Sequence, residues 1–419
     1  MKKKSSMHIV LWGFSVLFFI YQYGARSSVP NVLNNDLQQY FGVTAAEMGR
    51  LIGLFFITYT AMQIPVGILI DRLNVKLISV IACLSVALGM LAFVWTNSYQ
   101  VASLAQLLIG FGASFAFVLV IKVSNDFFPR EKVAFISSIG ISCGSLGPVS
   151  LNLLIANLAE IYPWKNIVCG IGIFGIIIVI IGYLAVDMKK LPKPTDVNHS
   201  AEKQLSIKDS IKVIISNIRI LLIGIFSMTI LGPVSAFCDA WGVSFMQSIY
   251  EVDKVAAASA VSMIYLGTMF GAPIAAYLSE KLKSYRKVML GGSVILVALF
   301  GTVIFVKLNF TILCILFFII GIAATCQFLS FPAALALTPK KIGATVTGVV
   351  NTVTMLGSTI LVPIIGEIID FSKNYFKNAS YTPNDYKNGM LMIIVSIVLG
   401  MFTLFFIKDG YHKDGLNKS

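Results

Sequence analysis

The chain has 419 residues, of which 57% are hydrophobic and only 12% are charged, and its mean hydropathy is +0.86. A soluble protein of this length does not need so much apolar material for its core, so the composition excludes an ordinary globular protein and indicates a membrane protein. The net charge of +13 raises the question of a nucleic acid partner. Because the Lys and Arg residues lie mostly in short connectors between apolar runs, we expect none.

Apolar runs of about 20 residues, the length of helix that crosses a bilayer core, recur along the whole chain. They predict an all-α membrane protein with twelve transmembrane helices in two six-helix bundles. The expected spans are residues 8–30, 46–70, 76–96, 101–124, 133–158, 165–187, 219–247, 255–279, 287–306, 309–336, 342–367 and 388–407.

A long polar stretch divides the two sets of six. It contains two prolines and many charges, and it reads as a connector between domains. We therefore expect an N-terminal bundle over residues 1–188, a cytoplasmic linker over 189–217 and a C-terminal bundle over 218–419.

The basic residues predict the orientation of the spans. With both termini inside, the inner segments hold 23 Lys and Arg residues and the outer segments hold 7. Cytoplasmic loops of membrane proteins retain such an excess. We expect a multi-pass protein of a bacterial inner membrane with both termini in the cytoplasm.

Cysteine and histidine usage gives no sign of a metal site or a cofactor. The six cysteines lie in apolar runs without CxxC spacing, and the three histidines are scattered. Buried thiols are the simplest interpretation. We expect no metal and no cofactor.

The stretch GILIDRLNVK joins the second and third expected spans and resembles the signature of the major facilitator superfamily. Gly67, Asp71, Arg72 and Lys76 match that signature, whereas Asn74 stands where the family usually has Gly. The glycine would allow helices to approach closely, and the charges would latch the inner helix ends. The alternative is a basic turn that only fixes the topology.

An echo of this motif, YLSEKLKSYRK, occurs at the matching place in the second half. The resemblance therefore covers nearly the whole chain and implies two six-helix bundles that rock about a central site. Three stretches, QIPVGILIDR, LLIGFGASFAFVLVIKVSNDFFPREKVAFISSIG and FCDAWGVSFMQSIY, resemble a bacterial branch that includes phagosomal amino-acid transporters and siderophore-related carriers.

Two opposite charges fall deep within expected spans. Arg26 lies about 18 residues into the first span and Asp239 about 20 residues into the seventh, so at roughly 1.5 Å per residue they reach similar depths. In the fold that the resemblance implies, these helices face one another. Three roles stay open: binding of a zwitterionic substrate, a latch on the outer gate, or a purely structural role in which Arg26 extends to the headgroups and Asp239 caps a broken helix near Gly232 and Pro233.

Lys122 is a further candidate within a span. It lies near the inner end of the fourth span, one helical turn before Asp126. It would form an i,i+4 pair with that aspartate or serve as an anion site. Asp239 is the only acid well inside a span, so we expect it to carry the proton if a proton gradient drives transport.

Aromatic and polar side chains on several spans are candidates for the rest of the binding site, although helix packing explains each of them singly. These residues are Tyr23, Tyr59, Gln63, Trp241, Gln327 and Asn351.

The sequence thus predicts a secondary active transporter that moves a small polar nutrient, an amino acid or small peptide, by proton-coupled alternating access. An organic anion or a carboxylate siderophore is the alternative substrate. An enzyme is not expected, because no catalytic cluster or phosphate loop is present in the sequence. The expected partners are a small-molecule substrate and the lipid bilayer, and we expect a monomer.

Overall fold

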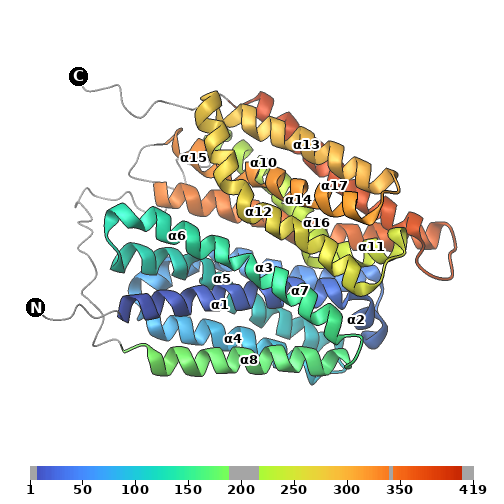
Figure 1. The fold of residues 1–419 in the computed structure, drawn as a ribbon, viewed down its shortest axis with the longest axis horizontal. Helices are drawn as coiled ribbons and strands as arrows, with labels where there is room; N and C mark the ends of the chain where they lie inside the picture. The colour runs from blue at the N-terminus through green and yellow to red at the C-terminus, as the bar shows by residue number, and fades with distance from the viewer. Residues whose placement is uncertain (1–6, 188–216, 339–342, 408–419) are drawn as a thin grey trace, which may run out of the picture.

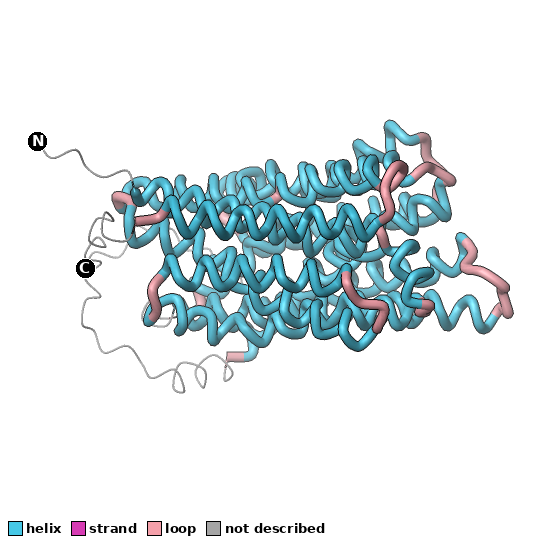
Figure 2. Tube along the Cα trace, turned by 90° about the horizontal axis from the view of Figure 1, so that it is seen from below, coloured by secondary structure: helices cyan, strands magenta, loops and turns pink. Residues whose placement is uncertain are grey.

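The computed structural model describes residues 7–187, 217–338 and 343–407, and within these ranges the chain is helical without a strand (Figure 1). Figure 2 shows that the described loops gather at the two ends of the helices. Backbone N–H and C=O groups in hydrocarbon have no water to bond with, and a helix pairs them within a single segment.

Eight helices precede the predicted linker. They are α1 (Met7–Val32), α2 (Asn34–Phe41), α3 (Ala45–Arg72), α4 (Val75–Val94), α5 (Tyr99–Phe127), α6 (Arg130–Gly144), α7 (Leu146–Leu158) and α8 (Trp164–Ala185).

Ten helical segments follow it in the described part of the chain. They are α10 (Ile218–Ala236), the π-helix η2 (Phe237–Trp241), α11 (Gly242–Tyr250), α12 (Lys254–Leu282), α13 (Tyr285–Phe305), α14 (Phe310–Ala324), the 3₁₀ helix η3 (Thr325–Leu329), α15 (Ser330–Leu335), α16 (Gly343–Tyr375) and α17 (Pro383–Phe405).

The number of helices that can cross a membrane confirms the predicted all-α fold. Eleven helical stretches of the described residues are long and apolar enough, and α3 together with α2, from which it turns by 111°, makes up to twelve. Two of the expected spans run through a short break, at Ser145 between α6 and α7 and at η3 between α14 and α15. The seventh span runs through η2.

Polar residues at the helix ends explain where several spans begin. Gly42 ends α2 with a φ of 64°, a left-handed conformation that glycine adopts without strain. Two residues later Thr44 begins α3 with a capping box to Glu47. Asn74, Asp253 and Asn309 cap α4, α12 and α14 in the same manner, through side-chain oxygens that accept backbone N–H groups.

Helices α1 to α8 pack mainly against one another, and so do α10 to α17, which Figure 1 shows as two neighbouring groups. Gly24 of α1 lies against the backbone of Gly147, and Gly232 of α10 lies against that of Gly357. A side chain at any of these glycines would collide with backbone atoms, so small residues set these helix distances. The predicted domain boundaries stay a prediction, because residues 188–216 lie outside the described part.

Three pairs of elements make the main contacts between the two groups: α3 with α16, α7 with α12, and α1 with η2. A Cβ on Gly49 would lie 3.0 Å from the Val362 carbonyl oxygen, and a Cβ on Gly53 would lie 2.8 Å from Pro363 Cγ. We call the end of the molecule that carries α2 the α2 side, and the end where α1 begins the terminal side (Figure 1).

Candidate functional site

A buried ion pair joins the two groups of helices. Arg26 Nη1 of α1 lies 3.1 Å from Asp239 Oδ2 of η2, and the two side chains are 15% and 3% exposed. A charge buried in a membrane protein is costly unless a partner or water compensates it, and here each charge compensates the other. The structure therefore brings together the two charges that the sequence places at similar depth.

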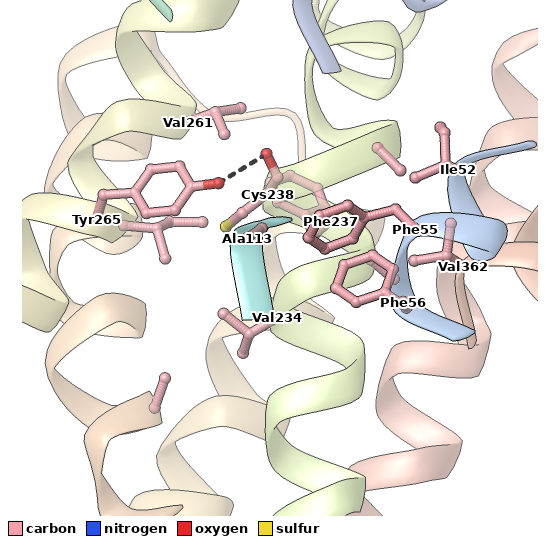
Figure 3. Close-up of a cluster of buried hydrophobic side chains, with 14 of the residues drawn as sticks. Ile52, Phe55, Phe56, Ala113, Val234, Phe237, Cys238, Val261, Tyr265 and Val362 are labelled. Carbon is pink, nitrogen blue, oxygen red and sulfur yellow. Dashed lines mark hydrogen bonds between the residues drawn. The ribbon is translucent and has the colours of Figure 1, made fainter. Parts of the chain in front are cut away.

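A tyrosine fixes the carboxylate from the opposite side. The Tyr265 hydroxyl of α12 lies 2.6 Å from Asp239 Oδ1 and 3.1 Å from the Cys238 carbonyl oxygen, the second contact being the dashed line in Figure 3. Asp239 thus has one oxygen on Arg26 and the other on Tyr265. Arg26 and Tyr265 each donate a hydrogen bond to the carboxylate, so its position is fixed from two helices.

Aromatic rings surround the guanidinium group. Arg26 Cζ lies 4.4 Å from the ring centroid of Tyr23, 5.4 Å from that of Phe55 and 5.7 Å from that of Phe56. The negative faces of such rings attract a cation and exclude water around it. The centroid of the Tyr23 ring lies 5.8 Å from that of Tyr265 on α12, so the aromatic surroundings of Arg26 have contributions from both groups of helices.

The π-helix determines where the carboxylate points. The Gly242 N–H bonds to the Phe237 carbonyl five residues earlier, the spacing of a π turn, and Asp239 lies in the middle of this turn. Single π turns inside α-helices are frequent at functional sites. The break expected near Gly232 and Pro233 is not there, because α10 continues through Pro233 to Ala236.

A polar layer lies between α3 and α16. Asn351 Nδ2 donates to Gln63 Oε1 at 2.7 Å, and the hydroxyls of Thr60 and Thr359 lie 3.3 Å apart. Gln63 also donates to the Tyr59 carbonyl at 3.3 Å. Two predicted site residues, Gln63 and Asn351, are thus brought into contact across the interface, and Tyr59 lies beside them.

Three predicted site residues lie apart from the ion pair in this conformation. Trp241 is fully buried and donates its indole N–H to the Val362 carbonyl at 3.1 Å. Gln327 of η3 accepts a hydrogen bond from Ser227 at 2.8 Å within the second group of helices. Lys122 lies 3.3 Å from Asp126, the i,i+4 pair that the spacing allows. A substrate contact for these three stays a prediction.

The predicted gating motif lies at the terminal end of α3 and the start of α4. The side chains of Asp71 and Arg72 lie outside the described part of the structure, so their latch stays a prediction. A Cβ on Gly67 would meet no atom of the described residues within 4 Å in this conformation, and its role in a close helix approach stays a prediction. Lys76 Nζ lies 4.5 Å from the ring centroid of Tyr183.

Polar contacts close the interface at the α2 side. Lys254 Nζ lies 2.6 Å from Asp36 Oδ2, and Arg50 pairs with Glu367. The carboxylate of Asp370 accepts the backbone N–H groups of Ala45 and Ala46, at 3.2 and 2.8 Å, which are orphan donors at the first turn of α3.

Tyr381 completes this contact from the loop after α16. Its hydroxyl donates to Asp370 and accepts the Ala45 N–H at 2.9 Å. Burial raises the pKa of Tyr381 above its ordinary value, so the phenol stays protonated and donates at neutral pH. The first turn of α3 is therefore hydrogen-bonded to the second group of helices.

Sequence reasoning missed Tyr265, Phe55 and Phe56 because tyrosine and phenylalanine in an apolar run read as ordinary packing. It also missed Asn31, which accepts the N–H of Val243 at the start of α11, and Asn34, which donates to the Ala240 carbonyl of the π-helix. The stretch PNVLNND, three asparagines directly after a proline within an apolar run, is the signal that would have found them.

These features define a class of protein: a multi-pass membrane protein whose two groups of helices enclose a charged site between them. Among the described residues, no group of three or more His, Cys, Asp or Glu side chains is arranged to hold a metal ion. The chemistry available at the ion pair is recognition of charge, exchange of one ionic partner for another, and transfer of a proton to a carboxylate.

The chain belongs to the Major Facilitator Superfamily, whose pattern its sequence matches over residues 14–362 and again over residues 231–417. The resemblance noted in the GILIDRLNVK motif is thereby confirmed at the level of the superfamily. The narrower likeness to one bacterial branch stays a prediction.

Two curated relatives carry different names. The membrane sensor protein UhpC of Salmonella typhimurium is 25% identical over 287 residues, which are 65% of this chain and 64% of the relative. A probable L-galactonate transporter of Escherichia coli is 24% identical over 180 residues, 40% of this chain and 38% of the relative. The chain thus aligns with less than two thirds of the length of either relative.

Two solved structures share the fold. A bacterial homolog to the human lysosomal transporter Spinster, in an inward-facing and unoccupied conformation, has a TM-score of 0.80 at 16% identity and covers 96% of this chain and 97% of its own. The nucleoside transporter NupG has a TM-score of 0.76 at 15% identity and covers 96% of this chain and 99% of its own.

Proposed function

We propose that this protein is a secondary active transporter that takes up an amino acid or a small peptide together with a proton. One observation carries the proposal: the pair of Arg26 and Asp239, opposite charges 3.1 Å apart at the junction of the two groups of helices. A zwitterion carries the same two charges in complementary order, so a substrate carboxylate would replace Asp239 at Arg26 while the ammonium group would replace Arg26 at Asp239.

This exchange makes recognition and gating one event. While the pair is formed, it holds α1 against η2. A substrate that takes both partners would release the two helices from each other and replace each lost contact, so neither charge would be left unpaired. The binding and latch roles of Arg26 and Asp239 are then two stages of one cycle.

A proton gradient would drive the cycle through Asp239. Its carboxylate lies between a cation and a phenol, and opening of the site before a substrate arrives would separate it from the cation. Loss of a neighbouring positive charge favours the protonated form of an acid. A proton would then bind Asp239 from the open side, and the substrate ammonium group would donate to the carbonyl oxygen of the protonated carboxyl, so that substrate and proton would be carried together at a single site.

The distribution of basic residues supports an orientation for this cycle. We place the α2 side outside and the terminal side, with both chain ends, in the cytoplasm of a bacterium. The polar contacts at Asp36, Arg50 and Asp370 would then close the outer face, and this conformation would be the one that is closed to the exterior.

A thermal-shift screen of the purified chain tests the substrate class. Amino acids, short peptides, sugars and carboxylates are added in turn to the unsubstituted protein and to the Arg26→Ala and Asp239→Asn variants. We expect an amino acid or short peptide to raise the melting temperature of the unsubstituted protein and to leave both variants unchanged. A shift by sugars alone would contradict the proposal.

Uptake into proteoliposomes tests the coupling. We expect a proton gradient to drive uptake by the unsubstituted protein and not by Asp239→Asn. Asp126→Asn is the matched control, because Asp126 also pairs with a cation but lies at the terminal end of α5. Unchanged gradient-driven uptake by Asp239→Asn would contradict a role of this carboxylate in proton transfer.

An organic anion is the second candidate substrate, since one relative bears the name of a transporter for a carboxylate, L-galactonate. Arg26 would bind that carboxylate while Asp239 takes only the proton. A thermal shift by hydroxy acids and none by amino acids would favour this candidate. A ligand that binds without saturable flux would instead indicate a sensor, the function named for UhpC.

A further inference from the structure

The backbone of the π-helix is bound by side chains from the other group of helices. Asn34 Nδ2, at the start of α2, donates to the Ala240 carbonyl at 2.7 Å. Asn31 Oδ1, near the end of α1, accepts the N–H of Val243 at 3.2 Å. Both asparagines are fully buried. One face of the α1–α2 segment therefore holds a donor for a carbonyl and an acceptor for an N–H on either side of Trp241.

These contacts supply hydrogen-bond partners to backbone groups at the π turn. Backbone groups around a π turn depart from the regular α-helical ladder, and such irregular segments persist where other groups bond to them. The Cys238 carbonyl likewise bonds to Tyr265, so contacts from α1, α2 and α12 surround Asp239 along the backbone. In hydrocarbon an unpaired backbone group costs several kcal/mol, so these contacts are worth more than surface ones.

A hydrogen bond within α2 fixes the orientation of the Asn34 side chain. Gln38, one turn further along α2, donates to Asn34 Oδ1 at 2.6 Å, which leaves the Asn34 amide N–H groups to face the π-helix. The next residue, Asn35, is different. It meets side chains of α11, accepting from Ser244 Oγ at 3.1 Å, and not the backbone of the π turn.

We propose that Asn31 and Asn34 form a clamp on the π-helix, which holds Asp239 opposite Arg26 and keeps the α2 side closed. Opening of the α2 side separates α1 and α2 from η2, so the Ala240 carbonyl and the Val243 N–H lose their partners at the same moment. The π turn is then released, and the carboxylate is freed from its fixed position. Asn31 and Asn34 act as positioning residues through the backbone, and this role does not depend on which substrate is carried.

Two buried cysteines, one in the π turn and one in the first group of helices, allow a direct test of the clamp. Cys238 lies within the π turn at 2% exposure, and Cys83 of α4 is fully buried among α1 to α8. The full chain is prepared with only these two cysteines, in nanodiscs where both faces are accessible. Labelling by a small methanethiosulfonate reagent is followed at each site by mass spectrometry, for the unsubstituted asparagines and for Asn31→Ala, Asn34→Ala and Asn35→Ala.

We expect Asn31→Ala and Asn34→Ala to raise the labelling rate of Cys238 about tenfold, the population shift that follows loss of one buried hydrogen bond. Cys83 should stay protected in both variants, and Asn35→Ala should label Cys238 as slowly as the parent. Asn34→Asp keeps the shape but loses the donor, so it should behave like Asn34→Ala.

Two results would overturn the clamp. Labelling of Cys238 in Asn34→Ala and Asn34→Asp at the rate of Asn35→Ala would show that the contact with Ala240 does not hold the π turn. Equal rises at Cys83 and Cys238 would show that the asparagines support the fold as a whole. Neither result bears on the proton-coupled uptake of amino acids, which the proteoliposome experiment tests separately.

Discussion

Helix α1 and the segment from α10 to α11 hold corresponding places in the two halves of the chain, yet they present their charges differently. Helix α1 stays α-helical through Arg26, whereas its counterpart turns into a π-helix at Phe237–Trp241 around Asp239. Arginine has a long side chain that reaches a partner from a regular helix. Aspartate has a short one, so here the backbone itself is displaced to bring the carboxylate to Arg26 and Tyr265.

The difference also explains how the two charges are supported. Aromatic rings surround the guanidinium group of Arg26, which suits a delocalised cation. Hydrogen bonds to side chains and to the neighbouring backbone hold the carboxylate of Asp239. Loss of one aromatic ring beside Arg26 should therefore reduce uptake less than loss of one hydrogen-bond donor to Asp239.

Removal of either charge of the ion pair should have the largest effect, because neither Arg26 nor Asp239 keeps its ionic partner. Arg26→Ala and Asp239→Ala each leave a buried charge unpaired, which typically costs about 3–5 kcal/mol. We expect each single variant to lose uptake and to melt at a clearly lower temperature in detergent. The double variant should melt above either single one, since no unpaired charge remains. A double variant less stable than both would contradict the pairing.

Loss of the phenol that orients the carboxylate should come next. Tyr265→Phe removes the 2.6 Å hydrogen bond to Asp239, and such bonds to charged groups contribute about 1.5–3 kcal/mol. We expect a 10- to 100-fold fall in the proton-driven uptake rate, measured in proteoliposomes. Tyr23→Phe is the control on α1, because it keeps the ring that faces Arg26. Equal losses of uptake in Tyr265→Phe and Tyr23→Phe would show that the hydroxyl bound to Asp239 contributes no more than the hydroxyl of Tyr23.

The polar layer between α3 and α16 should contribute less. Asn351→Ala removes the 2.7 Å hydrogen bond to Gln63, and a neutral bond of this kind contributes about 1 kcal/mol. We expect a fall of a few degrees in the melting temperature and the same fall for Gln63→Ala. The double variant should lose little more than either single one, and fully additive losses would show that the two amides do not interact.

Lys122 should matter least of the charged candidates. Its partner Asp126 lies one helical turn away, and such i,i+4 pairs contribute about 0.3–0.5 kcal/mol. We expect Lys122→Ala to keep both the melting temperature and the apparent KM of uptake near those of the parent. A large rise of KM in this variant would indicate that Lys122 binds substrate, the anion-site role that the sequence analysis left open for it.

The sequence by itself determined the helical membrane fold, the superfamily, and the depth of Arg26 and Asp239. Hydrophobicity and length fix the spans because each helix pairs its own backbone in lipid, and depth follows from a constant rise per residue.

Only the tertiary structure decided which residues meet. Tyr265 reaches the Asp239 carboxylate and Asn34 reaches the Ala240 carbonyl from helices that are distant in sequence, and both contacts lie at the π turn of Phe237–Trp241. The same packing left Lys122 with its own neighbour and buried Trp241 against Val362. Which face of a helix meets another is set by packing of small residues between helices, and spacing along one chain does not contain that information.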